Sequence, residues 1–342
     1  MANMKTRKLG RTDVSVSELG FGGAPLGELF ERVSEAEAQE TLQAAWDAGV
    51  RYFDTSPFYG YGKSEQRIGR FLRQQRRQEF VLSTKVGRVL RATRDLDSFD
   101  PKMWVGGLPF DWAFDYSYDG IMRSYEDSLQ RLGLNSIDLL LIHDLDYFFH
   151  PNEERVTASM AQIYTSGWRA LDELRSSGQI KAVGAGLNML GMVPRFLEMV
   201  DLDFFIIAMP YTLLDQDALD VEFAQCAERN VNIVIGSVFA SGILATGATE
   251  NALYAYEPAP AEVLEKTRRM EAVCQRHHVP LPAAALQFPL AHPIVSAVIP
   301  GAHKPAHIHS NIKCFHYPIP NDLWAELKTE GLLREDAPTP VC

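Results

Sequence analysis

Eight short apolar runs, each followed by a segment with a helical pattern, constrain the fold of this chain more than any other feature. Three of the predicted helices have clear ends, because glycines at 49, 133 and 178 follow the segments 35–48, Tyr118–Leu132 and Gln162–Ser177. Several runs are apolar throughout, as in a parallel sheet that is buried on both faces. The predicted strands are Leu19–Gly22, Tyr52–Asp54, Phe80–Thr84, Asp138–His143, Ala182–Ala185, Phe204–Ala208, Asn232–Ile235 and Ser296–Ile299.

Eight strand–helix units in series predict an α/β fold of the closed (β/α)8 TIM-barrel type and not an open doubly wound sheet. An open sheet that binds a dinucleotide would carry Gly-x-Gly-x-x-Gly after its first strand. Here the chain reads GFGGAPLG from Gly20, which lacks the third glycine at the required offset. No repeat, low-complexity tract or linker divides the chain, so residues 1–342 are expected to form one domain.

Composition and charge argue against several classes of function. The 33 basic and 44 acidic residues give a net charge of −11 without a basic stripe, so no nucleic-acid partner is expected. No apolar run approaches the roughly 18 residues of a membrane span, and the N-terminus lacks the apolar segment of a signal peptide. The cysteines are far apart, as in a reduced cytoplasmic protein. They are Cys226, Cys274, Cys314 and Cys342.

Two long connections interrupt the regular alternation. Arg88–Ser117, after the third strand, is rich in aromatic residues, and Phe239–Pro260, after the seventh, is rich in glycine, alanine and proline. Connections of this length in a compact domain are commonly functional. Because both follow strands, both are expected as loops at the C-terminal face of the barrel, where active sites form.

Four polar residues fall at or just beyond the ends of three neighbouring strands. Asp54 ends the second strand and Tyr59 follows it in FDTSPFYGYGKSE. Lys85 ends the third strand in STKVG, and His143 ends the fourth in LLLIHDLD. A single lysine or histidine at such a place is more often solvated or structural than catalytic. Four of them at one barrel mouth predict a catalytic site.

These four residue types suit a proton transfer that accompanies a hydride transfer. A free tyrosine has a pKa of about 10, which is too high for a base near neutrality. An ammonium beside the phenol is expected to lower that pKa. In this hypothesis Asp54 orients Lys85, Lys85 activates Tyr59, and His143 hydrogen-bonds the reacting oxygen.

The chain resembles the aldo-keto reductase superfamily over nearly its whole length. The family's Asp–Tyr–Lys–His tetrad maps in order onto Asp54, Tyr59, Lys85 and His143. The resemblance implies a barrel that binds NAD or NADP in extended form, without a Rossmann domain. The segments that carry it are RKLGRTDVSVSELGFGG, GVRYFDTSPFYGYGKSE, LSTKVGR, IDLLLIHDLD, IKAVGAGLN and VIPGAHKPAHIHSNI.

The resemblance also implies a cofactor site, although some positions depart from the family's pattern. The nicotinamide carboxamide is expected to bind Asn188 in AGLN, where the family has a Ser-Asn pair. Ala208 and Gly236 stand where the family has a glutamine and a stacking aromatic residue. The other residues expected to bind the cofactor are Gly23, Tyr211, Ser237, Phe239, Gly301, Lys304, His307 and Asn311.

The segment after the eighth strand bears on cofactor choice. Members of the family that prefer NADP present an arginine and a lysine to the 2′-phosphate, and here His307 and Gly301 occupy those places, with Lys304 as a substitute. A mostly neutral histidine supplies less charge than arginine, so NAD is expected over NADP. A metal site formed by His303, His307 and His309 is the disfavoured alternative, because no carboxylate or thiolate lies nearby in the sequence.

Within the superfamily, GAPLGELF and SYDGIMRSYEDSLQRLGL resemble the branch of D-threo-aldose (L-fucose) 1-dehydrogenases, L-galactose dehydrogenases and pyridoxal 4-dehydrogenases. This implies oxidation of a hemiacetal-type alcohol to a lactone, with either a sugar or pyridoxal as the small-molecule substrate. Trp104 and Trp112 are expected to stack on that substrate, a packed lid being the alternative.

Three other functions are weighed against this one. The first is a reductase of small aldehydes or ketones with NADPH. The second is a binding module like the β subunit of a potassium channel, which would share the fold. A metal-dependent hydrolase is disfavoured, because only His143 and Asp144 offer ligands at the strand ends.

Overall fold

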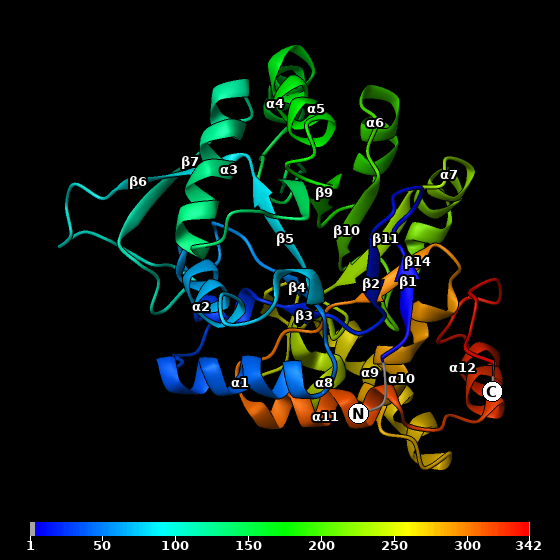
Figure 1. Ribbon diagram of the computed structural model, residues 1–342. Coiled ribbons are helices and arrows are strands. Elements are labelled where there is room, and N and C mark those ends of the chain that lie inside the picture. Colours follow the sequence, from blue (N-terminus) through cyan, green and yellow to red (C-terminus); the bar gives the residue numbers. More distant parts are fainter. Residues whose placement is uncertain (1–3, 342) are drawn as a thin grey trace.

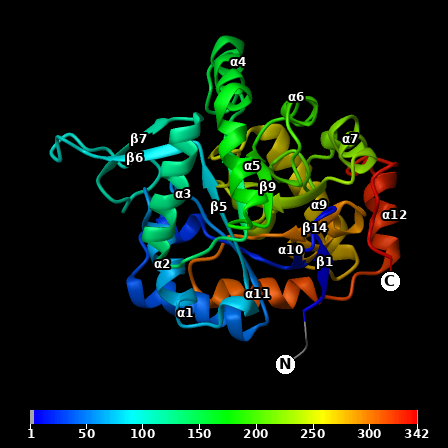
Figure 2. The same cartoon turned by 45° about the horizontal axis from the view of Figure 1, so that its top comes forward.

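An eight-stranded parallel sheet forms the centre of the computed structural model, which describes residues 4–341. The sheet order is β14–β11–β10–β9–β8–β5–β4–β3, and bridges of Leu19 with Val298 and of Gly22 with Gly301 join its two ends. These contacts close the sheet, which confirms the predicted (β/α)8 barrel (Figures 1 and 2). The barrel strands are β3 (Phe21–Gly22), β4 (Tyr52–Asp54), β5 (Val81–Val86), β8 (Leu139–His143), β9 (Ala182–Leu187), β10 (Phe204–Ala208), β11 (Asn232–Gly236) and β14 (Val295–Val298).

Helices surround the sheet on its outer side (Figure 2). Their ends follow ordinary capping rules: Ser34 Oγ accepts from Glu37 N at 3.1 Å, and Gly133 ends α3 with a φ of +62°. The helices are α1 (Glu35–Asp47), α2 (Lys63–Leu72), α3 (Tyr118–Leu132), α4 (Glu153–Gln162), α5 (Trp168–Ser176), α6 (Met192–Met199), α7 (Glu222–Glu228), α8 (Ile243–Thr246), α9 (Ala261–Arg276), α10 (Leu281–Gln287), α11 (Pro305–Phe315) and α12 (Asn321–Thr329).

Most predicted strands are shifted by one or two residues at one end or both, and two of the wrong boundaries change the description of the chain. The helix predicted over Gln162–Ser177 begins earlier, because Asn152 caps α4 and the π turn η3 (Ile163–Gly167) then leads into α5. The third barrel strand runs to Val86, so Lys85 lies within β5 and not at its end. A Lys85 side chain that starts one residue inside the strand reaches into the barrel and not outward from its rim.

The interior of the barrel is closed at its N-terminal end. The antiparallel hairpin of β1 (Thr6–Lys8) and β2 (Ser15–Ser17) contributes Leu9, Val14 and Val16 to a core cluster that also contains interior side chains of the barrel strands, such as Leu141 and Phe204. A second and larger cluster fills the space between the sheet and the helices. Because the N-terminal end is packed with apolar side chains, a ligand can enter only at the C-terminal end.

The two long connections lie at that C-terminal end, but they are not irregular loops. The connection after the third barrel strand contains the antiparallel pair β6 (Arg88–Ala92) and β7 (Phe110–Phe114), which projects from the barrel in Figures 1 and 2. The connection after the seventh contains α8 and the short pair β12 (Leu253–Tyr254) and β13 (Glu257–Pro258). The predicted loop after the third strand is therefore a hairpin, because its alternating residues pair across the two strands.

Candidate active site

A buried ion pair lies at the base of the barrel mouth. Lys85 Nζ is 2.7 Å from Asp54 Oδ2 and also donates to the carbonyl oxygen of Thr55 at 2.8 Å. Ser83, which pairs with Asp54 in the sheet register, donates to the other carboxylate oxygen at 2.7 Å. Burial raises the pKa of Asp54, and the Lys85 ammonium opposes that rise. The two charges of the pair compensate each other, and the hydrogen bonds with Ser83 Oγ and the Thr55 carbonyl oxygen fix its geometry.

Tyr59 is held above this pair by a loop that packs closely against the first connection of the barrel. A Cβ on Gly27 would lie 2.5 Å from the carbonyl carbon of Tyr59, and a Cβ on Gly60 would lie 2.4 Å from the Gly27 oxygen. Only glycine permits this approach of two backbones. The Tyr59 ring is partly exposed, and Lys85 Nζ lies 4.7 Å from its centre. The structure thus brings Asp54, Lys85 and Tyr59 together.

The expectation that Lys85 lowers the pKa of Tyr59 is wrong for this state of the protein. Burial raises the pKa of Tyr59 well above the usual value, and the charges of Asp54 and Asp144 raise it further. The main physical reason is burial of the phenol, and the lysine charge that could oppose it is offset by the Asp54 carboxylate. The phenol is therefore protonated in the free enzyme at neutral pH.

His143 lies beside Tyr59, with the two ring centres 5.9 Å apart and nearly perpendicular. Its Nδ1 is 3.1 Å from Ser56 Oγ and 3.0 Å from Nη1 of Arg88. Burial lowers the pKa of His143 well below its usual value, and the charges of Arg88 and Lys85 lower it further. The imidazole is therefore neutral, and its Nδ1 is occupied by donors.

Sequence reasoning assigned no role to two charged residues that surround His143. Arg88 is 1% exposed and pairs with Asp144, the residue that follows His143. Asp144 has a φ of +51°, a left-handed conformation that is uncommon outside glycine and asparagine. Both residues are close in sequence to the predicted tetrad, since Arg88 lies three residues after Lys85 and Asp144 directly follows His143.

Aromatic side chains form one wall of the mouth. The rings of Trp104 and Trp112 lie 5.5 Å and 5.3 Å from that of Phe58, and Trp104 is also 5.6 Å from the ring of Tyr59. Among the described residues, Nε1 of Trp104 has no hydrogen-bond partner although it is buried. Both tryptophans predicted for the substrate lie beside Tyr59 or Phe58, but Trp104 is 2% exposed and packed in a core cluster, whereas Trp112 is partly exposed.

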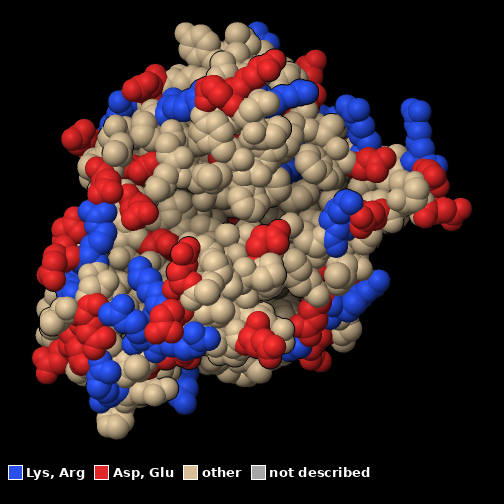
Figure 3. All heavy atoms as spheres, turned by 180° about the vertical axis from the view of Figure 1, so that it is seen from behind, with Lys and Arg blue, Asp and Glu red and all other residues tan. Residues whose placement is uncertain are grey.

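The face that contains the mouth is largely uncharged at its centre. The β1–β2 hairpin lies in front of the sheet in Figure 1, and Figure 3 shows the molecule from behind. In that view lysine, arginine, aspartate and glutamate side chains gather mainly at the periphery, and a few acidic side chains lie near the centre below a broad area without charged residues. A neutral or aromatic small molecule suits such a surface better than a highly charged one.

Of the residues predicted to bind the nicotinamide, the structure brings some to the mouth and not others. Asn188 donates its amide to Asp144 at 2.8 Å, so it lies near His143 but is already engaged. Ser237 has a φ of +47°, and its Oγ is 3.3 Å from the hydroxyl of Tyr256, a residue that sequence reasoning missed. Tyr211 instead lies in a separate buried cluster, and its ring is 4.4 Å from that of Phe223. It is not brought to the tetrad.

The other residues predicted for the nicotinamide half flank this region. A Cβ on Gly23 would lie 2.6 Å from the carbonyl oxygen of Asp54, so the first connection approaches β4 closely there. Phe239 is partly buried and packs against the main core cluster. Both residues lie beside barrel strands at the C-terminal end, because Gly23 follows β3 and Phe239 follows β11.

The segment after β14 contains the remaining predicted cofactor residues. Gly301 pairs with Gly22 next to β3, and α11 begins four residues later without an acidic residue in its first turn. The side chain of Asn311 is 9% exposed and lines a small cavity of about 10 Å³ between β3 and α11. A helix N-terminus beside a glycine suits a diphosphate. The residues present therefore fit the diphosphate part of a dinucleotide.

The carboxylate of Glu31 lies beside the predicted cofactor residues that follow β14, although the sequence near them contains no acidic residue. Glu31 Oε1 is 2.5 Å from Lys304 Nζ, and Glu31 Oε2 is 3.0 Å from His303 Nε2. The expectation that no carboxylate lies near these histidines is therefore wrong, because the connection before α1 folds against α11. The hydrogen bond from Lys304 lowers the pKa of Glu31, while burial lowers the pKa of His307. Glu31 is thus charged and His307 neutral.

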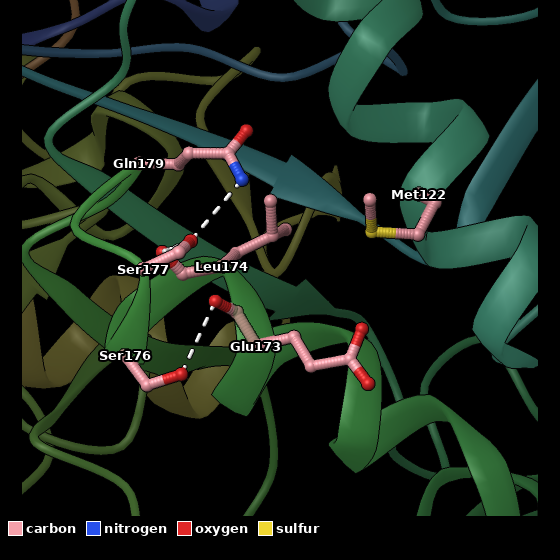
Figure 4. A pocket seen from close by; sticks show the side chains of 6 residues that line it. All are labelled: Met122, Glu173, Leu174, Ser176, Ser177 and Gln179. Carbon is pink, nitrogen blue, oxygen red and sulfur yellow. Dashed lines mark hydrogen bonds between the residues drawn. The ribbon is translucent and has the colours of Figure 1, made fainter.

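A hollow of about 390 Å³ lies away from the tetrad, between α3 and the C-terminal end of α5 (Figure 4). Met122 faces Leu174 across it, and the nearby polar groups are satisfied locally: Ser176 Oγ donates to Glu173 O at 3.3 Å, and Gln179 donates to Ser177 at 3.1 Å. The hollow is next to the N-terminal end of β9. Residues at that end of a barrel normally serve stability.

Residues 4–341 contain neither a cluster of metal-ligating side chains nor a membrane-spanning helix. No group of three or more histidine, cysteine, aspartate or glutamate side chains is placed to hold a metal ion. No helix in this range is long and apolar enough to cross a membrane. Cys226, Cys274 and Cys314 are free and buried, and Cys342 lies outside the described residues.

A (β/α)8 barrel with this buried lysine–carboxylate pair, tyrosine and histidine at its mouth defines a class of oxidoreductases. The model of the aldo/keto reductase family matches residues 18–329, and the chain belongs to that family. It is a dehydrogenase or reductase.

Individual relatives support this assignment. The chain is 44% identical to pyridoxal 4-dehydrogenase of Microbacterium luteolum over 96% of this chain and 97% of that protein. It is 39% identical to D-threo-aldose 1-dehydrogenase of a Pseudomonas species, over 96% of each. Among solved structures, the holo form of an aldo-keto reductase from Bacillus halodurans is similar with a TM-score of 0.71 and 24% identity, covering 97% of both chains.

Proposed function

We propose that this enzyme oxidises a cyclic hemiacetal, of an aldose or of pyridoxal, to the lactone with NAD. The observation that carries the proposal is that Tyr59 lies close to both the buried Lys85–Asp54 pair and His143. Removal of a proton from a hydroxyl requires a base, a cation that stabilises the charged base and a hydrogen-bond donor to the reacting oxygen. Tyr59, Lys85 and His143 would supply these three groups.

The residues of the chain would share the work as follows. His143 and the Tyr59 phenolate, whose fraction grows as the pH rises, would bind the hydroxyl of the substrate, and the phenolate would accept its proton as the carbon–oxygen bond becomes a carbonyl. An oxidised nicotinamide held at the mouth would supply the acceptor for the hydride of the same carbon and a positive charge. Lys85 stabilises the phenolate while Asp54 keeps the lysine in place. The proton and the hydride together account for the two hydrogens that the substrate loses.

Two observations support a hemiacetal substrate with a flat or cyclic body. The two relatives that are 44% and 39% identical are named for pyridoxal and for D-threo-aldose. Trp112 is partly exposed and offers a ring face, and the buried rings of Phe58 and Trp104 support it from behind. Aromatic faces stack on both sugars and pyridines.

The preference for NAD is supported by Glu31. Its carboxylate neutralises Lys304, which is the cation that sequence reasoning had assigned to a 2′-phosphate. A carboxylate repels a 2′-phosphate but accepts hydrogen bonds from a free ribose hydroxyl. His307 adds no charge, because burial lowers its pKa.

A substrate panel tests the proposal. L-fucose, D-arabinose, L-galactose and pyridoxal are each incubated with NAD and with NADP, and formation of reduced nicotinamide is followed by absorbance. We expect oxidation of at least one of these, with a lactone as the product by mass spectrometry and higher kcat/KM for NAD. Activity confined to reduction of open-chain aldehydes with NADPH would contradict the proposal.

A further inference from the structure

A fully buried arginine at the barrel mouth has no role in the chemistry described so far. The guanidinium carbon of Arg88 lies between 4.0 and 4.9 Å from the ring centres of Phe58, Trp112, Phe114 and Phe149. Its Nε and Nη2 have no hydrogen-bond partner within residues 4–341. Burying a cation in this way is costly unless other contacts compensate for it. The contacts of the remaining nitrogen are therefore informative.

That nitrogen, Nη1, contacts His143. It lies 3.0 Å from Nδ1 of the imidazole and also hydrogen-bonds the carboxylate of Asp144. A guanidinium only donates hydrogen bonds and does not lose its proton in proteins. Nδ1 must therefore accept, and the single proton of a neutral imidazole must be on Nε2. A histidine that is fixed in this way can donate from Nε2 and has no second donor.

Arg88 is itself held in place by the backbone turn at Gly87 and by the side chain of Asp144. Gly87 has a φ of +98°, and a Cβ there would lie 2.3 Å from the Tyr116 ring, so the turn that delivers Arg88 from β5 to β6 requires glycine. On the other side, Asn188 donates its amide to Asp144 Oδ1 at 2.8 Å. Residues that follow β5, β8 and β9 thus hold the Arg88 guanidinium in contact with the His143 imidazole.

The charges around His143 favour the neutral ring. Lys85 from β5 and Arg88 from β6 are cations, while Asp144 is the one carboxylate in contact, with its Oδ2 3.2 Å from Nε2. Asp144 is already paired with Arg88. The phenol of Tyr59 faces the ring, and the hydroxyl of Tyr116 donates to the carbonyl oxygen of His143 at 2.8 Å while also contacting His150.

We propose that Arg88 is a positioning residue for the reaction, because its guanidinium holds His143 as the neutral imidazole with the proton on Nε2. His143 then orients the substrate hydroxyl by donating a hydrogen bond, and Tyr59 alone accepts the proton. The part of the proposal that concerns the substrate rests on the proposed function. The part that concerns the imidazole does not, and it can be tested without substrate.

The first test uses the unmodified protein. Long-range ¹H–¹⁵N spectra of ¹⁵N-histidine-labelled enzyme report the tautomer of each ring, and the signal of His143 is assigned by its absence in His143→Asn. We expect the Nε2–H tautomer, unchanged on acidification through the pH of a free histidine, about 6.5. A proton on Nδ1, or an imidazolium at neutral pH, would overturn the proposal whether or not any substrate is turned over.

The second test uses Arg88→Met with Arg91→Met as the matched control, because Arg91 lies on the same strand but is exposed. In Arg88→Met we expect both tautomers of His143, a pKa closer to the ordinary value, and kcat lower by about 10- to 100-fold, the size of effect that small misplacements cause. A new loss of activity on acidification should appear in the same variant, and Arg88→Lys should restore part of kcat.

The two tests together separate positioning from simple folding. If Arg88→Met loses activity while His143 keeps the wild-type tautomer and titration, Arg88 acts only through the stability of the hairpin and the proposal is wrong. If Arg88→Met does not fold, the wild-type spectrum and that of Ser56→Ala decide, since Ser56 is the other contact of Nδ1. In Ser56→Ala the proton of His143 should stay on Nε2. A proton on Nδ1 in this variant would mean that Ser56, and not Arg88, sets the tautomer of His143.

Discussion

Nζ of Lys85 lies 2.7 Å from Oδ2 of Asp54, and the side chains of both residues are 3% exposed. The two charges largely cancel, so the barrel presents to Tyr59 a cation that is already partnered. The pKa of Tyr59 is raised in the free enzyme mainly by burial and also by the charge of Asp54. The carboxylate therefore both fixes the lysine and limits how strongly the lysine can act.

Removing the phenol of Tyr59 should abolish turnover. We expect Tyr59→Phe to lower kcat by about 10²- to 10⁴-fold, the usual contribution of a general acid or base, while NAD binding measured by fluorescence stays within a few-fold of wild type. Tyr61→Phe is the control, because it removes a phenol from the same loop that donates only to the Pro101 carbonyl oxygen. A Tyr59→Phe enzyme with more than a tenth of the wild-type kcat would exclude the proposed base.

The charges of the ion pair should move the pH profile in opposite directions. Because Asp54 raises the pKa of Tyr59, Asp54→Asn should lower the apparent pKa of the limb on which kcat/KM rises with pH. Lys85→Met should raise it, since the phenolate then lacks the ammonium that lies 4.7 Å from its ring centre. Profiles of kcat/KM against pH for the three proteins check this. Shifts in the same direction in both variants would mean that another group titrates.

Glu31 should limit the use of NADP. We expect Glu31→Gln to tighten NADP binding by about two- to fivefold, the range for an exposed ion pair, and to weaken NAD binding. Isothermal titration of each dinucleotide to the enzyme without substrate measures both effects. Glu40→Gln, an equal loss of charge at an exposed position of α1, should change neither. If Glu31→Gln and Glu40→Gln affect NADP equally, the role of Glu31 is only that of net charge.

His292 should make the fold sensitive to acid. Burial lowers its pKa to about 4, so the folded protein resists protonation that the unfolded chain accepts near pH 6.5. This stability is present above the unfolded pKa and is lost as the pH falls from about 6.5 towards 4. Allowing for partial exposure, we expect a loss of about 1 to 2 kcal/mol in this window.

Urea denaturation of the wild type and His292→Asn at pH 7 and pH 5 measures the effect of His292. The variant should show a smaller loss of unfolding free energy on acidification, whereas His316→Asn, at an exposed position, should behave as wild type. Equal losses in the wild type and His292→Asn would show that other groups cause the acid sensitivity.

The sequence alone determined the barrel and the order of the tetrad. Eight apolar runs at regular spacing can bury both faces only in a parallel sheet covered by helices, and the C-terminal ends of such strands meet at one mouth. The positions of Asp54, Tyr59 and His143 relative to their strands followed from that rule. The local sequence pattern was sufficient to predict these positions, because each residue is placed by its own strand and the turn after it.

The tertiary structure decided which charges face one another and how deeply they are buried. Glu31 meets Lys304 across 273 residues of sequence, and Arg88 reaches His143 across 55. Neither contact has a local pattern, because each depends on how two connections fold over the same mouth. The raised pKa of Tyr59 has the same origin, since burial and the distance between charges exist only once the barrel has closed.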